Sequence, residues 1–315
     1  TFSLKVFFWI LKNKNKYDIF IIHGIWHFST LLARILLKKK YFVFLHGGLD
    51  TYFRSELIKL IKKKIYWNLI EKKNLIYSKG LLLTNNFESK QIKNTFVNTK
   101  GIKKKNVGFG ILKPKINKIL CRKLFYKKFP YLKKKKYFLF LGRFHPKKGC
   151  YVLLDAVHKL KKKNIGINVL MVGPNSVYKK KLKKYSRQIG LEGNFFWHDT
   201  LTENLKWGSI LCSEGMVLSS HGENFGVSIV ESLCCSKPVL TTHKVGVSPE
   251  IINYKAGFVS KDNAKDYSSI LIKYLKLRNN KLKILANNSL KCFEKNFDLE
   301  VKINKLSIFL KKSLH

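Results

Sequence analysis

The chain has 315 residues, of which 63 are lysine or arginine and 18 are aspartate or glutamate, so its formal net charge is +45. Hydrophobic residues make up 45% of it, enough for two domains with cores of their own, which excludes a disordered polycation. The positive charge would attract nucleic acid, anionic lipid or phosphorylated substrates. Lysine, isoleucine and asparagine are abundant together, however, as an AT-rich genome also produces, so charge alone selects no function.

Short apolar runs alternate along the chain with longer amphipathic stretches. This alternation predicts an α/β architecture in which helices cover parallel sheets. The expected strands are 19–22, 41–45, 80–83, 137–141, 167–172 and 216–219. The expected helices are 4–11, 31–40, 54–77, 149–163, 177–189 and 227–235.

The stretch 113–136 is rich in lysine and arginine, lacks acidic residues, contains Pro114 and Pro130, and precedes a new strand. Such a composition is typical of a passage between domains. We therefore expect a first domain, a basic linker, a second domain and a C-terminal helix that returns toward the first domain, over 1–115, 116–136, 137–297 and 298–315. Because the chain opens at Thr1 rather than at Met, we also expect it to be a piece of a longer protein.

Cysteines and apolar runs predict the compartment. The six cysteines form no C-x-x-C pair and no cluster with histidine at zinc spacing, which favours reduced thiols. No apolar run approaches the ~20 residues of a membrane span, and no secretory signal pattern is present. The sequence therefore predicts a cytoplasmic protein.

A candidate anion site follows the strand at 137–141. The strand ends at a glycine that permits a tight turn, and Arg143 and Lys148 come before the next helix. Ligands of α/β proteins bind outside the carboxyl ends of such strands. Arginine offers a fork of donors for phosphate oxygens and lysine a point charge, so both are expected to converge on one anion. The alternative for Lys148 is a solvated surface lysine.

Two carboxylates stand eight residues apart, Glu223 in a loop after a strand and Glu231 within the following helix. Eight helical residues rise ~12 Å, about the span between the two sugar rings of a nucleotide-diphosphate sugar. The two carboxylates can therefore accept hydrogen bonds from the two sugars. Between them, the helix N-terminus at 225–227 offers N–H groups and a positive dipole end to a diphosphate. By itself, such a pair would instead be interpreted as a charge at a helix N-terminus, Glu223, and a surface charge, Glu231.

These segments together resemble the group 1 (family 4) retaining glycosyltransferases. The run 219–239 carries the family's E-x7-E signature in its S-x-x-E-N-F-G form, followed by K-P-V. The segment with Arg143 and Lys148 matches the G-R-x-x-x-x-K-G motif, and 241–252 resembles the downstream G-x-x-E-I-I segment. The motifs keep the family's order and cover most of 137–260.

The resemblance implies the GT-B fold, with two Rossmann-like domains that face a cleft, the first on the acceptor side and the second binding the nucleotide sugar. It implies a retaining, metal-independent hexosyltransferase, without a cofactor other than the nucleotide-diphosphate sugar as co-substrate. No Asp-x-Asp metal motif appears, and no side chain is placed as a nucleophile, which favours same-face attack by the acceptor. The site residues it implies are His46 and Glu223 for catalysis, and Arg143, Lys148, Asn224, Phe225, Gly226, Val227 and Glu231 for donor binding.

The first part of the chain resembles the family's N-terminal domain at two strand ends, 21–26 and 44–50. The resemblance implies that His46 contacts the donor near the bond that breaks, with a structural histidine as the alternative. We expect structural roles for His23 and for 84–86. Nothing before Ile19 matches the family's first strand and Gly-rich loop, so an incomplete N-terminal domain is expected.

Two histidines depart from the family pattern. His198 follows 195–197 where relatives often have glycine, in a loop that usually lies near the nucleobase, and His221 replaces a small residue. We expect both to be tolerated surface histidines.

The expected partners are a nucleotide sugar donor, a glycan or lipid-linked acceptor of cell-envelope polysaccharide biosynthesis, and an anionic membrane surface. Nucleic acid is not an expected partner, because no recognition motif accompanies the charge. The alternatives are a basic nucleic-acid-binding protein, a GT-B relative that is not a transferase, and a catalytically inactive GT-B fragment.

The expected helix 54–77 is basic and amphipathic. Leu57, Ile61, Ile65 and Leu69 recur at helical spacing among lysines. Such a helix can lie in an anionic interface at the inner face of the cytoplasmic membrane. For this helix we instead expect the apolar stripe to pack on the sheet, and we base peripheral membrane association on the net charge of the whole protein.

Overall fold

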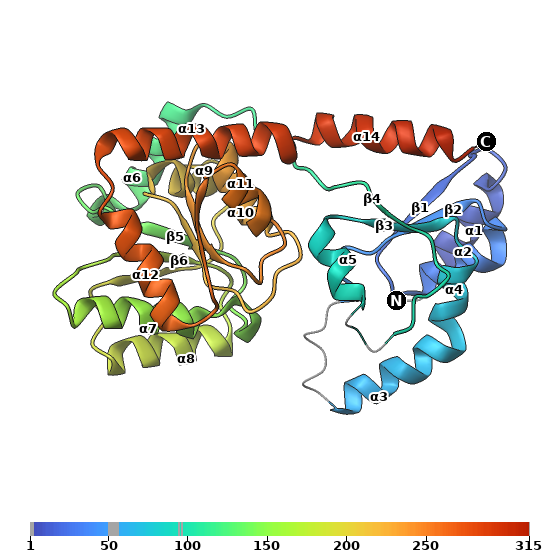
Figure 1. Ribbon diagram of the computed structural model, residues 1–315, viewed down its shortest axis with the longest axis horizontal. Coiled ribbons are helices and arrows are strands. Elements are labelled where there is room, and N and C mark those ends of the chain that lie inside the picture. Colours follow the sequence, from blue (N-terminus) through green and yellow to red (C-terminus); the bar gives the residue numbers. More distant parts are fainter. Residues whose placement is uncertain (1–2, 50–56, 94, 96, 315) are drawn as a thin grey trace. The chain divides into compact units, whose positions relative to one another are not determined.

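The computed structural model describes residues 3–49, 57–93, 95 and 97–314 and divides into two compact units. Unit 1 comprises Thr1–Phe109 and Glu300–His315, and unit 2 comprises Gly110–Leu299. Each unit holds one parallel sheet with helices packed against it, so the α/β class predicted from the sequence is confirmed (Figure 1).

Unit 1 is built on the sheet β1-β2-β3-β4, in which all neighbours are parallel. Its strands are β1 (Phe20–His23), β2 (Tyr41–Phe44), β3 (Gly80–Leu83) and β4 (Lys104–Asn106). Its helices are α1 (Leu4–Asn13), α2 (Phe28–Leu37), α3 (Leu57–Tyr66), a π-helical turn (Trp67–Glu71), α4 (Lys72–Ile76), α5 (Asn86–Lys93) and α14 (Leu299–Lys312).

The apolar run of β2 is buried on both faces of the sheet, which explains why its sequence is continuous rather than alternating. Successive side chains of a strand point to opposite faces. Tyr41 and Val43 join the core cluster that includes α1 and α2, whereas Phe42 and Phe44 join the cluster that includes Phe309 of α14. Helix α14 therefore closes one face of the unit 1 sheet.

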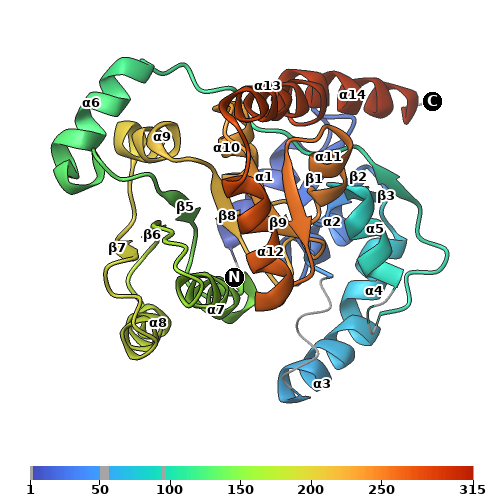
Figure 2. The ribbon, with the colours of Figure 1, turned by 60° about the vertical axis from the view of Figure 1, so that its left-hand side comes forward.

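Unit 2 contains the sheet β10-β9-β8-β5-β6-β7, again with parallel neighbours (Figure 2). Its strands are β5 (Phe138–Leu141), β6 (Val169–Val172), β7 (Phe195–His198), β8 (Met216–Leu218), β9 (Val239–Thr242) and β10 (Gly257–Ser260). The chain runs outward from β5 through β6 and β7, then returns to β8 on the other side of β5. The strand order therefore reverses between β5 and β8, which is where open α/β sheets bind ligands.

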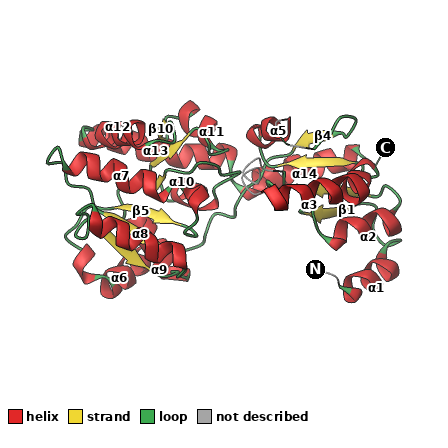
Figure 3. Cartoon of the chain, turned by 90° about the horizontal axis from the view of Figure 1, so that it is seen from below, coloured by secondary structure: helices red, strands yellow, loops and turns green. Residues whose placement is uncertain are grey.

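The helices of unit 2 cover this sheet (Figure 3). They are α6 (Lys118–Lys128), α7 (Cys150–Lys161), α8 (Val177–Gln188), α9 (Glu203–Cys212), α10 (Val227–Cys234), α11 (Ser248–Asn253), α12 (Ala264–Leu275) and α13 (Asn279–Asn296). The expected strands recur within two residues of their predicted bounds. His198, which the family resemblance places in a loop, is the last residue of strand β7.

The stretch 116–136, expected as a linker, is instead helical and belongs to unit 2. Asn117 caps the start of helix α6, because its side chain accepts a hydrogen bond from the Leu120 N–H group. Cys121 and Phe125, one helical turn apart, are fully buried, and α6 packs on α9 where Gly208 permits close approach. The many lysines on the outer face of α6 made this short apolar stripe difficult to recognise in the sequence.

The expected helix 54–77 appears as α3, the π-helical turn and α4, and its first residues, 54–56, lie outside the described part of the chain. The prediction that its apolar stripe packs on the sheet is wrong. Ile61, Ile65 and Leu69 are 50%, 55% and 65% exposed, because the helix buries another face, with Trp67 and Leu75. The side chain of Leu57 lies outside the described ones. Over the described residues, no helix combines the length and the apolar character needed to cross a membrane.

Candidate functional site

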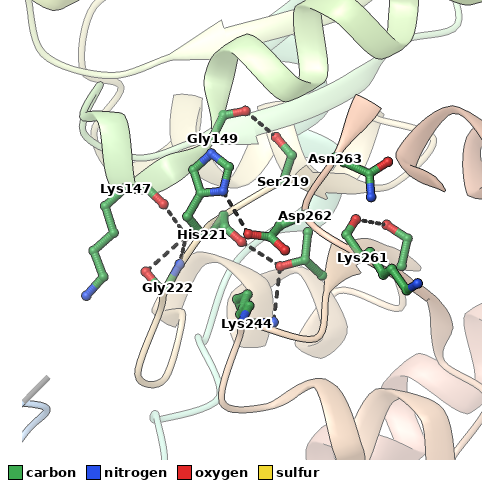
Figure 4. A network of polar contacts seen from close by, with 12 residues as sticks. Lys147, Gly149, Ser219, His221, Gly222, Lys244, Lys261, Asp262 and Asn263 are labelled. Atoms are coloured by element: carbon green, nitrogen blue, oxygen red, sulfur yellow. Dashed lines mark hydrogen bonds and ion pairs between the residues drawn. The ribbon is translucent and has the colours of Figure 1, made fainter. Parts of the chain in front are cut away.

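Two loops of unit 2 meet beside the carboxyl ends of the neighbouring strands β5 and β8. The first, 142–149, follows β5, and the second, 219–226, follows β8. The Ser219 hydroxyl donates to the Gly149 carbonyl over 2.8 Å, and the His221 N–H group donates to the Lys147 carbonyl over 2.8 Å (Figure 4). The motifs recognised separately in the sequence therefore form one structure.

Gly149 is required where these loops cross. Its φ is +63°, a backbone conformation that favours glycine. A Cβ atom at this position would lie 1.9 Å from the Ser219 carbonyl oxygen, which is a fixed backbone atom. The glycine of the G-R-x-x-x-x-K-G motif thus permits the close contact that holds the two loops together.

An ion pair between Lys148 and Glu223 joins the chemical groups of the two loops. The two side chains are 21% and 20% exposed, so the pair is partly accessible to a ligand. The backbone of Glu223 is fixed by the loop after β9: its N–H group donates to Lys244 over 3.0 Å, and its carbonyl accepts from Gly246 over 2.8 Å. The structure therefore brings together Lys148 and Glu223, as a cation and a carboxylate at the switch point.

Arg143 lies in the same loop as Lys148, and its side chain is exposed. The positive charges of this loop affect the pKa of His145. Burial lowers the pKa of His145, and the charges of Arg143, Lys147 and Lys148 lower it further. A site that disfavours a further positive charge is suited to an anion.

The residues 224–227 lead into helix α10 and serve different purposes. The Phe225 side chain is 7% exposed and packs edge-on against Phe297, with 5.7 Å between ring centroids. It therefore anchors the loop in the core. Gly226, with φ +76°, precedes the first turn of α10, where Val227 is 48% exposed, and Asn224 is partly buried. Backbone N–H groups at this helix start are the groups that an anion would meet.

Glu231 pairs with a cation that the sequence analysis missed. The Lys206 ammonium of α9 lies 2.8 Å from a Glu231 oxygen, and the side chains are 27% and 14% exposed. The same ammonium lies 4.2 Å from the Trp207 ring centroid. No sequence motif identifies Lys206, because 25 residues separate it from its partner and lysines are abundant throughout.

The expectation that His221 and His198 are tolerated surface histidines describes neither fully. The His221 ring lies 2.9 Å from the Asp262 carboxylate (Figure 4). Burial would raise the pKa of Asp262, but the hydrogen bond from His221 and nearby positive charges outweigh it, so the pKa is lowered. His198 ends β7 and packs edge-on against Phe129, with 4.7 Å between ring centroids.

In unit 1, two histidines meet at the carboxyl ends of β1 and β2. His23 Nδ1 lies 2.8 Å from His46 Nε2, and the His46 ring stacks on Phe44 with 4.3 Å between centroids. Burial lowers the pKa of His46, and His23 lowers it further. In the sequence, each of these two strand ends carries a histidine followed by a glycine. Because adjacent parallel strands end side by side, the two histidines meet.

A buried carboxylate supports the turn that carries His46. Glu88 is 2% exposed and accepts hydrogen bonds from the Gly47 N–H group and from the Thr84 N–H and hydroxyl groups. Glu88 was missed in the sequence, whereas 84–86 was expected to be structural. Among the described residues, no group of three or more His, Cys, Asp or Glu side chains is arranged to hold a metal ion.

Comparison with known proteins agrees with this geometry. Residues 123–291 match the family model of the glycosyl transferases group 1. An uncharacterized glycosyltransferase of Methanocaldococcus jannaschii is 33% identical over 169 residues, 51% of this chain and 44% of that protein. An alpha-1,3/1,6-mannosyltransferase of Dictyostelium discoideum is 23% identical over 157 residues, 45% of this chain and 37% of that protein. The matched part thus spans less than half the length of these curated relatives.

Solved structures are similar over nearly the whole chain. A glycosyltransferase from Rickettsia africae has a TM-score of 0.73 at 21% identity and covers 100% of this chain and 84% of its own. An Anabaena protein solved with UDP and glucose has a TM-score of 0.74 at 16% identity and covers 98% of this chain and 81% of its own. These similarities show the GT-B fold, as the sequence motifs implied.

Proposed function

The chain belongs to the group 1 glycosyltransferases, and from that premise we propose that it moves a hexose-type sugar from a nucleotide-diphosphate sugar to a glycan or lipid-linked acceptor, with retention of configuration. The observation that carries this proposal is the meeting of Lys148 and Glu223 at the switch point of unit 2. A cation for the diphosphate and a carboxylate for sugar hydroxyls lie side by side, as a donor of this class needs. The binding of UDP and glucose by the Anabaena protein supports the same class of donor.

In the proposed donor complex, Lys148 and Glu223 exchange partners. Without ligand, each neutralises the other at a partly accessible position. With the donor, Lys148 and Arg143 bind the diphosphate and Glu223 accepts from the transferred sugar. Glu231, whose pairing with Lys206 is described above, accepts from the ribose hydroxyls. The backbone N–H groups at 225–227 and Asn224 complete the donor contacts.

The proposed reaction takes place on one face of the sugar. The acceptor hydroxyl oxygen attacks the anomeric carbon, and the bond from that carbon to the β-phosphate oxygen breaks, its electron pair remaining on the phosphate. The acceptor proton passes to the same phosphate oxygen. Negative charge develops on the leaving diphosphate, where Arg143, Lys148 and the start of α10 stabilise it. We propose that this set of cations removes the need for a metal and for any cofactor besides the donor.

We propose His46 as the catalytic group of unit 1. Its lowered pKa keeps the imidazole neutral near pH 7, so one ring nitrogen can donate a hydrogen bond to a sugar hydroxyl or phosphate oxygen. His23 would fix the tautomer by accepting or donating at Nε2 of His46.

We propose that the acceptor belongs to cell-envelope polysaccharide biosynthesis and that the enzyme works at the cytoplasmic face of a membrane. The exposed stripe of Ile61, Ile65 and Leu69 supports this, because Lys62 and Lys64 lie beside it on α3. A basic amphipathic helix with an exposed apolar face is suited to an anionic interface. Co-sedimentation with liposomes, with and without anionic lipid and at low and high salt, tests the site. Equal recovery in the supernatant under all four conditions would rule it out.

The donor assignment is tested by calorimetry and by hydrolysis of a panel of nucleotide sugars. We expect Arg143→Ala and Glu231→Ala to weaken donor binding by ~1.5–3 kcal/mol each, about 10- to 150-fold, because each removes a charge-assisted contact. The matched controls are Lys162→Ala and Glu192→Ala, which remove an exposed cation and an exposed carboxylate of the same unit. Unchanged donor affinity in both site variants would overturn the assignment.

Metal independence has its own test. We expect turnover to survive EDTA, since the proposed diphosphate site supplies its own positive charge. Loss of turnover that Mg²⁺ or Mn²⁺ restores would contradict the proposal.

A further inference from the structure

Unit 1 contains a cavity of about 930 Å³ at the amino-terminal ends of strands β2, β3 and β4. Its walls come from the residues before β2, from 76–81, from 101–105 and from the end of α14. No aspartate or glutamate is among the described residues that line it. Six lysines line it: Lys39, Lys79, Lys103, Lys104, Lys105 and Lys312.

Several of these lysines are held in place by neutral groups. The Lys79 ammonium donates to the Ser313 carbonyl over 2.6 Å, and the Lys104 ammonium donates to the Thr99 carbonyl over 2.9 Å. The Lys105 ammonium lies 5.7 Å from the Phe309 ring centroid. Because an ammonium has three donors, these contacts leave further N–H groups for a ligand and leave the positive charge uncompensated.

Lys104, one of the lysines of the cavity, is also close to a lysine outside it, Lys93 of α5. Burial lowers the pKa of this ammonium, and the charge of Lys93 lowers it further. Like charges held together destabilise each other unless an anion lies between them. In unit 2, by contrast, Lys148 and Lys206 each have a glutamate partner.

The cavity is separate from the candidate active-site groups of the same unit. His23 and His46 lie at the carboxyl ends of β1 and β2, whereas the cavity opens at the amino ends. A four-residue strand is about 13 Å long, which divides the two locations. Its volume is of the size that holds small organic ligands.

We propose that this cavity is a second anion-binding site, which takes a phosphate ester or diphosphate carrying two or more negative charges. The lysines supply point charges for phosphate oxygens. Phe42, Leu81 and Phe309, which also line the cavity, supply apolar contact for the organic part of the ligand. The phosphate belongs either to a soluble compound or to a lipid headgroup, and the two sources are separated by the test.

The test uses inorganic pyrophosphate and the full chain carrying Arg143→Ala and Lys148→Ala, so that the proposed donor site does not contribute. In that background we add Lys39→Gln, Lys103→Gln, Lys105→Gln and Lys312→Gln. We expect pyrophosphate to bind about ten-fold or more weakly after the change, since losing one charge-assisted contact suffices for that factor. The matched control replaces four exposed lysines of unit 2 by glutamine, at 162, 163, 181 and 184.

Equal weakening by the two sets, or none by either, would overturn the proposal, because binding would then follow net charge alone. If the fourfold variant fails to fold, as circular dichroism would show, the pair Lys103→Gln and Lys312→Gln replaces it, with the pair at 162 and 163 as control.

A vesicle arm identifies the source of the phosphate. Phosphatidylcholine vesicles that contain phosphatidic acid are compared with vesicles in which phosphatidylserine supplies the same charge. Preference for phosphatidic acid that the cavity variants abolish assigns the site to a lipid headgroup, and pyrophosphate binding without that preference assigns it to a soluble compound. Because donor binding by the otherwise unchanged chain should survive the cavity substitutions, failure here is distinguishable from failure of the proposed glycosyltransfer.

Discussion

Charge is organised differently in the two units. In unit 2, two cations of the candidate site have carboxylate partners, Lys148 with Glu223 and Lys206 with Glu231. In unit 1, the buried carboxylate Glu88 supports a backbone turn, while the lysines of the cavity gather without an acidic partner among the described residues. A cation with a partner that a ligand can displace suits reversible binding of a substrate. A cation cluster without one is unfavourable until an anion arrives.

The largest effect is expected where the two loops of unit 2 cross. Gly149→Ala would place Cβ against the Ser219 carbonyl at a left-handed φ, so we expect the free energy of unfolding to fall by ~3 kcal/mol or more, with loss of donor binding. Gly166→Ala is the control, because its Cβ would meet no atom within 4 Å. Urea unfolding of both variants measures the difference, and equal stability would show that the loops do not depend on this contact.

Isosteric substitution of one carboxylate in each unit separates support of the fold from chemistry. Glu88→Gln removes the charge from a buried acceptor of three hydrogen bonds, and we expect it to cost ~2 kcal/mol in the free energy of unfolding. Glu223→Gln is expected to change that free energy by less than about 1 kcal/mol, since its pair is partly exposed, but to lower turnover about 100-fold. The opposite ranking, in unfolding and turnover assays, would contradict the comparison.

Two ion pairs of unit 2 that differ in exposure test how burial changes the contribution of an ion pair to stability. Lys206→Met leaves Glu231 partly buried without its cation, and we expect a loss of ~1 kcal/mol in the free energy of unfolding. Arg187→Met breaks the exposed pair of Arg187 and Glu192, which lie 3.2 Å apart with side chains 68% and 75% exposed. We expect no loss beyond ~0.5 kcal/mol there. Thermal or urea unfolding decides whether the two variants differ.

The smallest effects are titrations, for which we predict directions. His46 has a lowered pKa in the folded state, so the unfolded state binds more protons between the two pKa values. The contribution of His46 to stability is therefore complete above its unfolded pKa, ~6.5, and is lost as pH falls through the folded value. His46→Gln should reduce this acid-side loss. Unfolding measured across pH 5 to 8 tests it, and an unchanged slope would be inconsistent with a lowered pKa of His46 in the folded state.

His145 provides the counterpart in unit 2. After burial, the causes of its lowered pKa are Arg143 and Lys148, which are proposed to bind the diphosphate, and Lys147, so a bound anion or Lys148→Ala should raise the pKa of His145. The pKa of His46, which depends on burial and His23, should not respond to Lys148→Ala. Imidazole NMR titrations of both residues test the contrast. A shift in the pKa of both histidines, or of neither, would contradict the predicted difference between them.

The sequence by itself determined the elements and the placement of the motifs. Strand runs such as those of β2 and β5 are apolar throughout because both faces of a parallel sheet are covered. The glycine after β5, the basic residues Arg143 and Lys148, and the spacing of Glu223 and Glu231 are local features that fix turns, helix starts and charges. The fold class and the family could be predicted from these alone.

Only the tertiary structure decided which groups meet. Lys148 reaches Glu223 because β8 lies beside β5, on the side opposite β6, and strand order is not encoded in local periodicity. For the same reason, the pairing of Lys206 with Glu231 could not be predicted from the sequence. Nor could the lysine cavity, whose walls come from four separate segments of the chain. Apolar spacing at Ile61 and Ile65 indicated a helix, but the opposite face is the one that packs on the core. Periodicity shows that a helix has a stripe, whereas the partners available in space decide which face is buried.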